Sequence, residues 1–148
     1  MSFFSKIEEI VKDAKKGKMF ILVDDKNREN EGDLVVPAQK INAEKINFMA
    51  KHGRGLICLA LSGKRIEELN LPLMPQHNTP RRKTAFTISI EAKKGISTGI
   101  STKDRAKTIQ VAISNKKSSK DISTPGHIFP LRAEDGGEIG RASCRERV

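Results

Sequence analysis

The sequence predicts a single α+β domain with helices and strands in mixed layers, and three observations favour this fold class. Some segments carry apolar residues at helical spacing, whereas others carry short apolar runs or strict alternation, so both helices and strands are expected. These segments interleave in irregular order, which favours mixed layers over a regular repeating array. The length of 148 residues is enough to bury one hydrophobic core.

The first elements follow from apolar spacing and from residues that end helices or strands. Residues 2–16 carry apolar side chains at three- and four-residue steps, which predicts an amphipathic helix that ends at Gly17. Residues 19–23 form an apolar run that is expected to be a short buried strand. Residues 34–36 resume an extended segment, which Pro37 ends.

The middle of the chain is expected to alternate helices with strands. Asn42 can act as the N-cap of a helix, and Gly53 lies just past the predicted end of that helix. Residues 56–61 are an apolar strand, and residues 62–69 have the pattern of a short helix. Residues 70–84 contain three prolines and are therefore predicted to be an irregular loop.

Two further strands are predicted in the second half of the chain. Residues 85–91 alternate with period two, which predicts a half-buried strand with its Phe and Ile residues inward and Thr87 and Ser89 outward. Residues 127–132 form the last predicted strand. Because Pro130 lies in it, this strand is expected to be bent or to lie at the edge of the sheet.

Composition excludes several classes of protein. Hydrophobic residues make up 36% of the chain and charged residues 31%, which is typical of a globular protein. The longest apolar runs fall far short of the roughly 20 residues that cross a bilayer, so no membrane association is expected. The N-terminus has no secretory signal pattern, which predicts a cytoplasmic location. Cys58 and Cys144 are too few for a disulfide scaffold.

The basic charge of the chain suggests two kinds of partner. The net charge of +10 would suit nucleic acid, because phosphate neutralisation needs a basic surface. However, the chain has no Trp and no Tyr, so it lacks the aromatic platform on which single-stranded bases stack. We therefore expect an anionic small molecule and no nucleic acid. A basic nucleic-acid or ribosome-associated binding module is the alternative.

An acidic stretch, DDKNRENEGD at residues 24–33, is the densest chemical signal in the sequence. If the chain is extended here, Glu29, Glu31 and Asp33 point to one face, because side chains alternate along a strand. Converging carboxylates suit Mg²⁺, which prefers oxygen ligands. A solvated acidic turn is the alternative. An EF-hand loop is excluded, because the glycine and the final glutamate that it requires are absent.

Residues 95–105 contain four hydroxyl side chains and two glycines, and a helix that runs to about Ser114 is expected to begin there. Ser101 or Thr102 can cap this helix. Backbone N–H groups at a helix start, with hydroxyls such as that of Thr98, would suit a phosphate or another oxyanion. The alternative, given equal weight, is that the hydroxyls serve only as caps and turn formers.

His127 and Cys58 are the remaining candidates for a site. His127 follows a Pro-Gly turn at the start of a predicted strand, where it could act as a general acid or base near neutral pH. A single histidine is more often structural. Cys58 lies within an apolar strand, which favours buried packing over the lining of a pocket.

In this order and at these separations, the three segments resemble the 3,4-dihydroxy-2-butanone 4-phosphate synthase family of riboflavin biosynthesis. The resemblance covers residues 3–137 and is strongest in residues 24–35, 84–109 and 125–137. It implies a mixed β-sheet flanked by helices. It also implies a lyase that converts D-ribulose 5-phosphate to L-3,4-dihydroxy-2-butanone 4-phosphate and formate. It also implies a homodimer that uses Mg²⁺ or Mn²⁺, with two divalent ions in the complete enzyme and no organic cofactor.

The same resemblance implies roles for individual residues. Glu29 matches the metal-ligating glutamate of the family, and His127 matches a histidine needed for activity. Either Glu31 or Asp33 would be the base that removes the substrate's C3 proton, and the sequence does not separate them. The residues expected to contact the substrate are Arg28, Glu29, Asp33, Cys58 and Thr98.

The chain departs from the family after Gly137. There the family continues with an Arg-x-Gly-His-Thr-Glu segment that supplies a second metal ligand and phosphate contacts, whereas this chain reads EIGRASCRERV. That tail resembles the translation of a common sequencing adapter. We therefore expect residues 1–137 to be a truncated synthase domain, incomplete at its C-terminus, and residues 138–148 to be non-native. The 148-residue chain alone is expected to be inactive.

Overall fold

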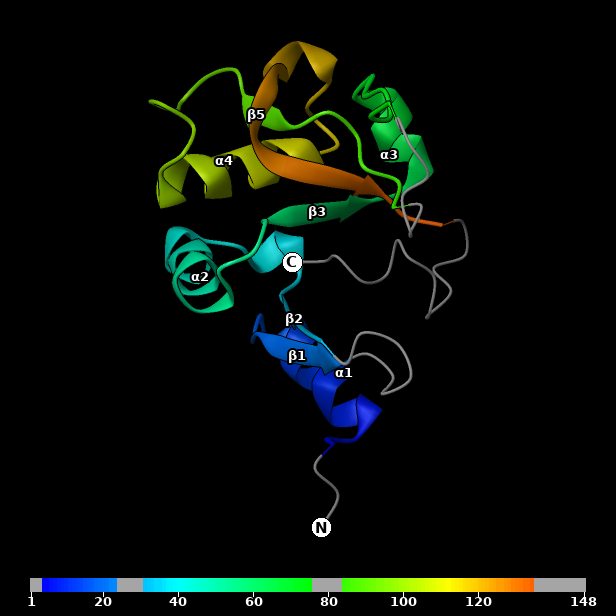
Figure 1. The fold of residues 1–148 in the computed structure, drawn as a ribbon, viewed down its shortest axis with the longest axis vertical. Helices are drawn as coiled ribbons and strands as arrows, with labels where there is room; N and C mark the ends of the chain where they lie inside the picture. Colours follow the sequence, from blue (N-terminus) through cyan, green and yellow to red (C-terminus); the bar gives the residue numbers. More distant parts are fainter. Residues whose placement is uncertain (1–3, 24–30, 76–83, 135–148) are drawn as a thin grey trace.

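The structure, a computed structural model, describes residues 4–23, 31–75 and 84–134. These residues form helices and two β-sheets, which confirms the predicted α+β class (Figure 1). Within the described residues, no helix is both long and apolar enough to cross a lipid bilayer.

The larger sheet has three strands and contains both parallel and antiparallel pairs. Its strand order is β3 (Cys58–Leu61), β5 (Ile122–Arg132) and β4 (Ile90–Ala92). β5 is parallel to β3 and antiparallel to β4, as expected for a mixed sheet. Helix α4 (Thr102–Ile113) packs against β4 and β5 (Figure 1). The sheet and this helix contain the main part of the hydrophobic core.

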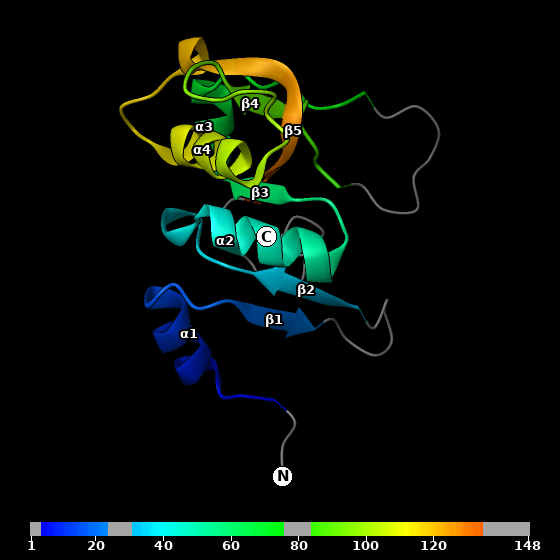
Figure 2. The same ribbon diagram turned by 90° about the vertical axis from the view of Figure 1, so that its left-hand side faces the viewer.

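The smaller sheet is an antiparallel pair, β1 (Phe20–Val23) and β2 (Gly32–Val35). Helix α1 (Ile7–Lys15) precedes it, within the range predicted to be helical, and Gly17 follows with a φ of 80°. Figure 2 shows α1 at one end of the molecule, followed by β1 and β2, and then by α2 between β2 and β3. The polar segment between β1 and β2 lies mostly outside the described residues.

Local capping explains where two other helices begin. Helix α2 (Ala43–Phe48) starts after Asn42, whose side chain accepts a hydrogen bond from the backbone N–H of Lys45 at 2.9 Å, as the sequence predicted. It continues as a π-helical turn, η2 (Met49–Gly53). Short 3₁₀ helices are formed by η1 (Ala38–Lys40) and η3 (Ser119–Asp121). Helix α3 (Gly63–Glu68) is capped by Ser62.

The prediction that residues 19–23 form a buried strand is wrong about burial. The strand is present, but Ile21 is 63% exposed and Val23 is 45% exposed. Helix α1 is similar, since none of its residues is buried and Ile7 is 75% exposed. An apolar pattern shows which face of an element avoids water, but it does not show whether a neighbouring element covers that face.

The prediction for residues 85–91 is also wrong in part. Regular pairing begins only at Ile90, and the preceding residues form isolated bridges. Thr87 and Ser89, which were expected to face solvent, are buried. The Thr87 hydroxyl donates to the carbonyl of Ile88 at 3.0 Å, and the Ser89 hydroxyl accepts from the N–H of Gly126 at 3.0 Å. Both faces are therefore covered, and hydrogen bonds satisfy the polar groups.

The last strand, β5, is bent rather than at an edge, because it lies between β3 and β4 (Figure 2). Successive N–H groups of a strand point to opposite sides. The N–H of Phe129 donates to the carbonyl of Ile57, which directly precedes β3. The N–H of Arg132 donates to Ala85 on the other side. An N–H at position 130 would point to the same side as that of Arg132, towards the segment that forms the isolated bridge of Phe86 with Leu131. Pro130 therefore interrupts no regular ladder of hydrogen bonds.

Candidate active site

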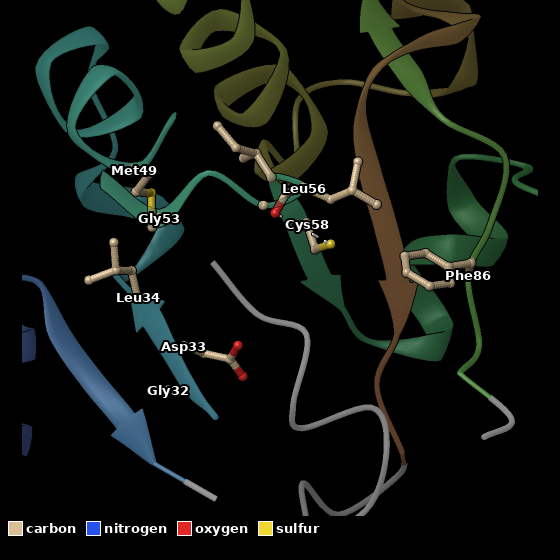
Figure 3. A pocket seen from close by; sticks show the side chains of 10 residues that line it. Gly32, Asp33, Leu34, Met49, Gly53, Leu56, Cys58 and Phe86 are labelled. Atoms are coloured by element: carbon tan, nitrogen blue, oxygen red, sulfur yellow. Dashed lines mark hydrogen bonds between the residues drawn. The ribbon is translucent and has the colours of Figure 1, made fainter. Parts of the chain in front are cut away.

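A cavity of about 430 Å³ lies between β2, η2 and the start of β3. Figure 3 shows that Asp33 extends from β2 towards β3, where Cys58 begins the strand. The residues that line the cavity are Gly32, Asp33, Leu34, Met49, Gly53, Gly55, Leu56, Ile57, Cys58 and Phe86. Two of the predicted site residues, from motifs that are well separated in the sequence, therefore share one cavity.

Asp33 and Cys58 reach this cavity for different local reasons. Asp33 lies on β2, opposite Leu22 of β1, and is half-buried. Cys58 is 4% exposed and pairs with Phe129 of the central strand β5. The sequence favoured buried packing for Cys58, and the structure shows that this buried side chain also lines the cavity.

His127 lies in an irregularity of β5. Ile90 pairs with Ile128, whereas the next residue of β4, Glu91, pairs with Ser123, so residues 124–127 bulge out of the ladder. Bulges of this kind redirect side chains and are common beside active sites. Nδ1 of His127 forms a hydrogen bond with Oε1 of Glu91. His127 therefore has a carboxylate partner that the sequence analysis did not identify.

The hydroxyl-rich segment before α4 is organised around Asp104. Its Oδ2 accepts hydrogen bonds from the backbone N–H of Ser97 at 3.1 Å, from the Ser97 hydroxyl at 2.8 Å and from the N–H of Gly99 at 3.0 Å. The Ser97 hydroxyl, followed by these backbone donors, holds the pKa of the Asp104 carboxyl below its usual value despite burial. Ser101 is the N-cap, as predicted, and accepts from the N–H of Asp104 at 3.1 Å.

This arrangement bears on the predicted oxyanion site. The Asp104 carboxylate already occupies the N–H groups of Ser97 and Gly99, so these donors are not available to an external phosphate. For Ser97 and Ser101, the alternative role as turn formers and caps is correct. Thr98 is exposed between the two anchored residues.

The described structure brings the predicted site residues into two groups. Asp33 and Cys58 share the cavity, whereas His127 contacts Glu91, which lies against Gly99, the residue that follows Thr98. The groups are neighbours in the sheet, because Cys58 pairs with the residue two places after His127. Glu31 is exposed just before β2. The remaining candidates, Arg28 and Glu29, lie outside the described residues.

The sequence analysis missed two carboxylates, Glu91 and Asp104. Asp104 had a local signal, because the pattern Ser-x-x-Asp from Ser101 is that of a capped helix start. Glu91 had none, because its partner is 36 residues away and meets it only through the β4–β5 register. Among the residues that the structure describes, no three His, Cys, Asp or Glu side chains gather as a metal site would require.

A second cavity, of about 450 Å³, is basic and contains none of the predicted site residues. The residues that line it are Lys93, Lys94, Gly95, Lys107, Val111, Lys117, Lys120 and Asp121. One of its lysines is paired, because Nζ of Lys117 lies 3.0 Å from Oδ1 of Asp121. This cavity holds part of the excess positive charge of the chain, away from the cavity that contains Asp33.

Comparisons with known proteins match nearly the whole chain. The family model for 3,4-dihydroxy-2-butanone 4-phosphate synthase matches residues 8–147. A protein of that name from Photobacterium phosphoreum is 54% identical over 96% of this chain, and one from Neisseria meningitidis serogroup B is 54% identical over 99%. The chain spans only 39% and 40% of the length of these two relatives. The matches run past Gly137, so the non-native origin of residues 138–148 stays a prediction.

Solved structures give the same result. A two-domain 3,4-dihydroxy-2-butanone 4-phosphate synthase from A. baumannii is 48% identical, with a TM-score of 0.88 over 96% of this chain and 42% of that chain. A second synthase, solved in complex with two magnesium ions, is 38% identical, with a TM-score of 0.85 over 90% of this chain and 62% of that chain.

Proposed function

The chain belongs to the 3,4-dihydroxy-2-butanone 4-phosphate synthase family, and from this premise we propose that it carries part of a lyase active site. The reaction would convert D-ribulose 5-phosphate to L-3,4-dihydroxy-2-butanone 4-phosphate and formate, a step of riboflavin biosynthesis. The observation that carries this proposal is the cavity that Asp33 and Cys58 share, because both residues were expected to contact the substrate.

Asp33, rather than Glu31, is the base in this proposal. Asp33 lines the cavity and is half-buried, so its carboxylate can contact a substrate that is bound there. Glu31 is exposed and lies before the start of β2. The sequence left the two equivalent, and the difference in position supports Asp33.

His127 would act as the second acid/base group. Its ring is partly exposed, with 40% of the side chain accessible, so a substrate group can reach it. Arg28, Thr98 and Cys58 would contact the sugar phosphate together with Asp33. The guanidinium of Arg28 is suited to phosphate or carboxylate oxygens because its donors form a fixed fork.

The proposed cofactor is Mg²⁺ or Mn²⁺, with two divalent ions in the complete enzyme, and Glu29 is the residue of this chain that would hold one. The donor chemistry fits, because Asp33 presents a carboxylate to the cavity and hard cations prefer oxygen ligands. A bound divalent ion supplies Lewis-acid stabilisation of negative charge on substrate oxygens. No organic cofactor is proposed.

The partners and location in this proposal follow from the same family. We propose a homodimer in the cytoplasm that binds a sugar phosphate and neither nucleic acid nor membrane. The net charge of +10 then serves to attract a phosphorylated substrate.

The test measures the release of formate from ribulose 5-phosphate in the presence of Mg²⁺, for the complete protein and for two matched variants of it. Asp33→Asn removes the proposed base, so kcat should fall by about 10²–10⁴-fold. Glu31→Gln is the control, since it removes a neighbouring carboxylate outside the cavity, and it should leave kcat within about threefold. If Glu31→Gln causes the large loss and Asp33→Asn does not, the assignment of the base is wrong.

Two further measurements test the rest of the proposal. The 148-residue chain by itself should release no formate, and release at the rate of the complete protein would contradict the expectation of inactivity. Filter binding to RNA tests the alternative function. Salt-sensitive micromolar binding that Glu29→Ala leaves unchanged, without formate release by the complete protein, would favour the nucleic-acid module over the lyase.

A further inference from the structure

The basic cavity of about 450 Å³ lies where the end of β4, helix α4 and η3 meet. Five of the residues that line it are lysines, and Asp121 is the one carboxylate among its described lining residues. Five lysines against one aspartate leave an excess of four positive charges. These lysines form a lysine cluster, which consists of Lys93, Lys94, Lys107, Lys117 and Lys120.

Hydrogen bonds hold together the three segments that carry the lysine cluster. The N–H of Lys93, which follows β4, donates to the carbonyl of Asp121 in η3 at 2.8 Å. The N–H of Ala92, at the end of β4, donates to the buried hydroxyl of Thr108 on α4 at 3.0 Å. The turn after β4 is therefore tied both to η3 and to α4, and the fold keeps charges from three elements around one hollow.

Most of this charge is uncompensated within the described residues. Lys117 is paired, since its Nζ lies 3.0 Å from Oδ1 of Asp121. Oδ2 of Asp121 accepts a hydrogen bond from the N–H of Ser118 at 3.0 Å, within the capping box of η3. In the described part of the chain, none of the other four lysines of the cluster has a carboxylate within ion-pair distance.

The pKa of the Asp121 carboxyl reflects the positive charge around it. This pKa is lowered from its ordinary value of 3.8, first by the N–H of Ser118, then by the hydrogen bond from Lys117, and also by the charge of Lys94. The ammonium groups therefore stabilise the negative charge that is already present at the edge of the cavity. An external anion in the cavity would be stabilised by the unpaired lysines in the same way.

The lining of the cavity favours a chain of phosphates as the ligand. Each lysine presents a point charge with three donors, and several such groups suit an anion whose charges are adjacent. Among the described residues that line the cavity, none is aromatic, so a nucleic-acid base has no ring on which to stack. The volume of about 450 Å³ lies within the range of roughly 300–1,000 Å³ that is typical of small-molecule pockets.

We propose that the lysine cluster forms an anion site that binds a chain of two or three phosphates, either free or as part of a nucleotide. This site goes beyond the proposed lyase function, because ribulose 5-phosphate has a single phosphate. The cavity also shares no lining residue with the cavity that contains Asp33. Binding at the lysine cluster can be measured without turnover.

The test is calorimetric titration of the complete protein with tripolyphosphate, in a buffer without Mg²⁺ so that the phosphates keep their charge. The wild-type protein should bind one tripolyphosphate per chain. The double variant Lys93→Gln and Lys94→Gln should weaken binding by about tenfold or more, because two charge-assisted contacts are lost. Lys107→Gln, a single change on α4, should weaken it by about 2–5-fold. These side chains are exposed, so the variants should melt at the wild-type temperature.

Two controls separate the lysine cluster from the rest of the protein. The double variant Lys15→Gln and Lys16→Gln removes an adjacent pair of exposed lysines and changes the net charge equally. This pair lies at the end of α1, at the other end of the molecule from α4 (Figure 2), so binding should stay within about twofold. Arg28→Gln removes a proposed substrate contact and should also leave tripolyphosphate binding within about twofold.

ATP and inorganic phosphate identify the source of the ligand. Equal binding of ATP and tripolyphosphate would show that the phosphate chain alone is recognised, whereas tighter binding of ATP would identify a nucleotide as the ligand. Inorganic phosphate should bind at least about tenfold more weakly, because it contacts fewer lysines. Inorganic phosphate that binds as tightly as tripolyphosphate would contradict a site for a phosphate chain.

Other results would overturn the proposal as a whole. Equal losses in the two lysine pairs, or no saturable binding by the wild type, would show that the cavity is not a specific site. Loss of binding in Arg28→Gln alone would place tripolyphosphate in the substrate site. RNA binding that needs Lys93 and Lys94, without tripolyphosphate binding, would make this face a nucleic-acid surface. A complete protein that binds tripolyphosphate but releases no formate would contradict only the proposed function.

Discussion

The region of β3, β5, β4 and α4 and the region of α1 and β1 are both rich in isoleucine and valine, yet they differ in burial. Ile90 and Ile128, from neighbouring strands of the first region, are 0% exposed. Ile7 and Ile21, from the second region, are 75% and 63% exposed. In the part of the chain that the structure describes, the same side-chain type therefore lies in a packed core at one end of the molecule and in water at the other.

Charged side chains that contact the two regions also differ in burial. Arg65 is buried, and its guanidinium donates to the carbonyls of Ala112 at 2.8 Å and Ser114 at 2.8 Å, which ties α3 to the end of α4. Near α1, Lys18 and Asp13 form an ion pair at 2.9 Å in which both side chains are well exposed. Exposed pairs of this kind contribute at most about 1 kcal/mol. The comparison indicates that the stability of this chain resides in the sheet and α4.

The largest expected difference between the regions is the cost of removing an isoleucine side chain. Ile128→Ala should lower the free energy of unfolding by about 2–5 kcal/mol, because it leaves a cavity in the packed core. Ile7→Ala, the matched control, should change it by no more than about 0.5 kcal/mol. Urea unfolding followed by circular dichroism measures both. Equal losses at the two positions would show that α1 is covered in solution.

Substitutions at helix caps should change the free energy of unfolding by an intermediate amount, and the change should have opposite signs in the two regions. Ser101→Ala should lower the free energy of unfolding by about 1 kcal/mol, because the side chain that caps α4 is lost. Helix α1 has Lys6 at the capping position, with no side-chain hydrogen bond, so Lys6→Ser should raise its stability slightly. Hydrogen exchange of the α1 and α4 amides distinguishes these effects. A Ser101→Ala variant as stable as the wild type would contradict the capping role.

The smallest change in stability, limited to acid pH, is expected from replacing Asp104. The pKa of its carboxyl is lowered in the folded state from an ordinary value of 3.8, mainly by the Ser97 hydroxyl. A lowered folded pKa means that the stabilisation is fully present above about pH 3.8 and is lost as the pH falls through the folded pKa. Asp104→Asn should therefore flatten the acid limb of stability against pH.

A control variant distinguishes Asp104 from the other carboxylates. Ser97→Ala removes the largest cause of the lowered pKa but keeps the carboxyl, so its acid limb should lie between those of the wild type and Asp104→Asn. Urea unfolding at pH 5 and pH 3 supplies the measurement. An unchanged acid limb in Asp104→Asn would show that Asp104 does not contribute to acid stability.

Much of the secondary structure could be predicted because its causes are local. The caps at Asn42, Ser62 and Ser101 act on an amide three residues away, and the sequence shows both groups. The prediction for Thr87 and Ser89 was wrong because alternation suggests one polar face, whereas both hydroxyls are buried and form hydrogen bonds with the backbone of β5, at Pro130 and Gly126. Burial depends on neighbours that no local pattern specifies.

The candidate site could also be predicted only in part from the sequence. The residue types of the acidic stretch, the hydroxyl segment and the Pro-Gly-His segment were sufficient to indicate the family to which the chain belongs. They were not sufficient to choose between Glu31 and Asp33, since both lie on one face of an extended chain. The cavity favours Asp33, and only the folded arrangement of β2 and η2 creates that cavity.

The sequence by itself determined the fold class, the approximate positions of the α-helices and the kinds of side chain available for chemistry. These properties depend on residue type and on spacing within a few residues. Only the tertiary structure decided that Glu91 meets His127, because the register and bulge of β5 join residues 36 positions apart. It also decided which apolar faces are covered. Such contacts depend on how whole strands align, and a register shift of one residue would turn every side chain to the opposite face.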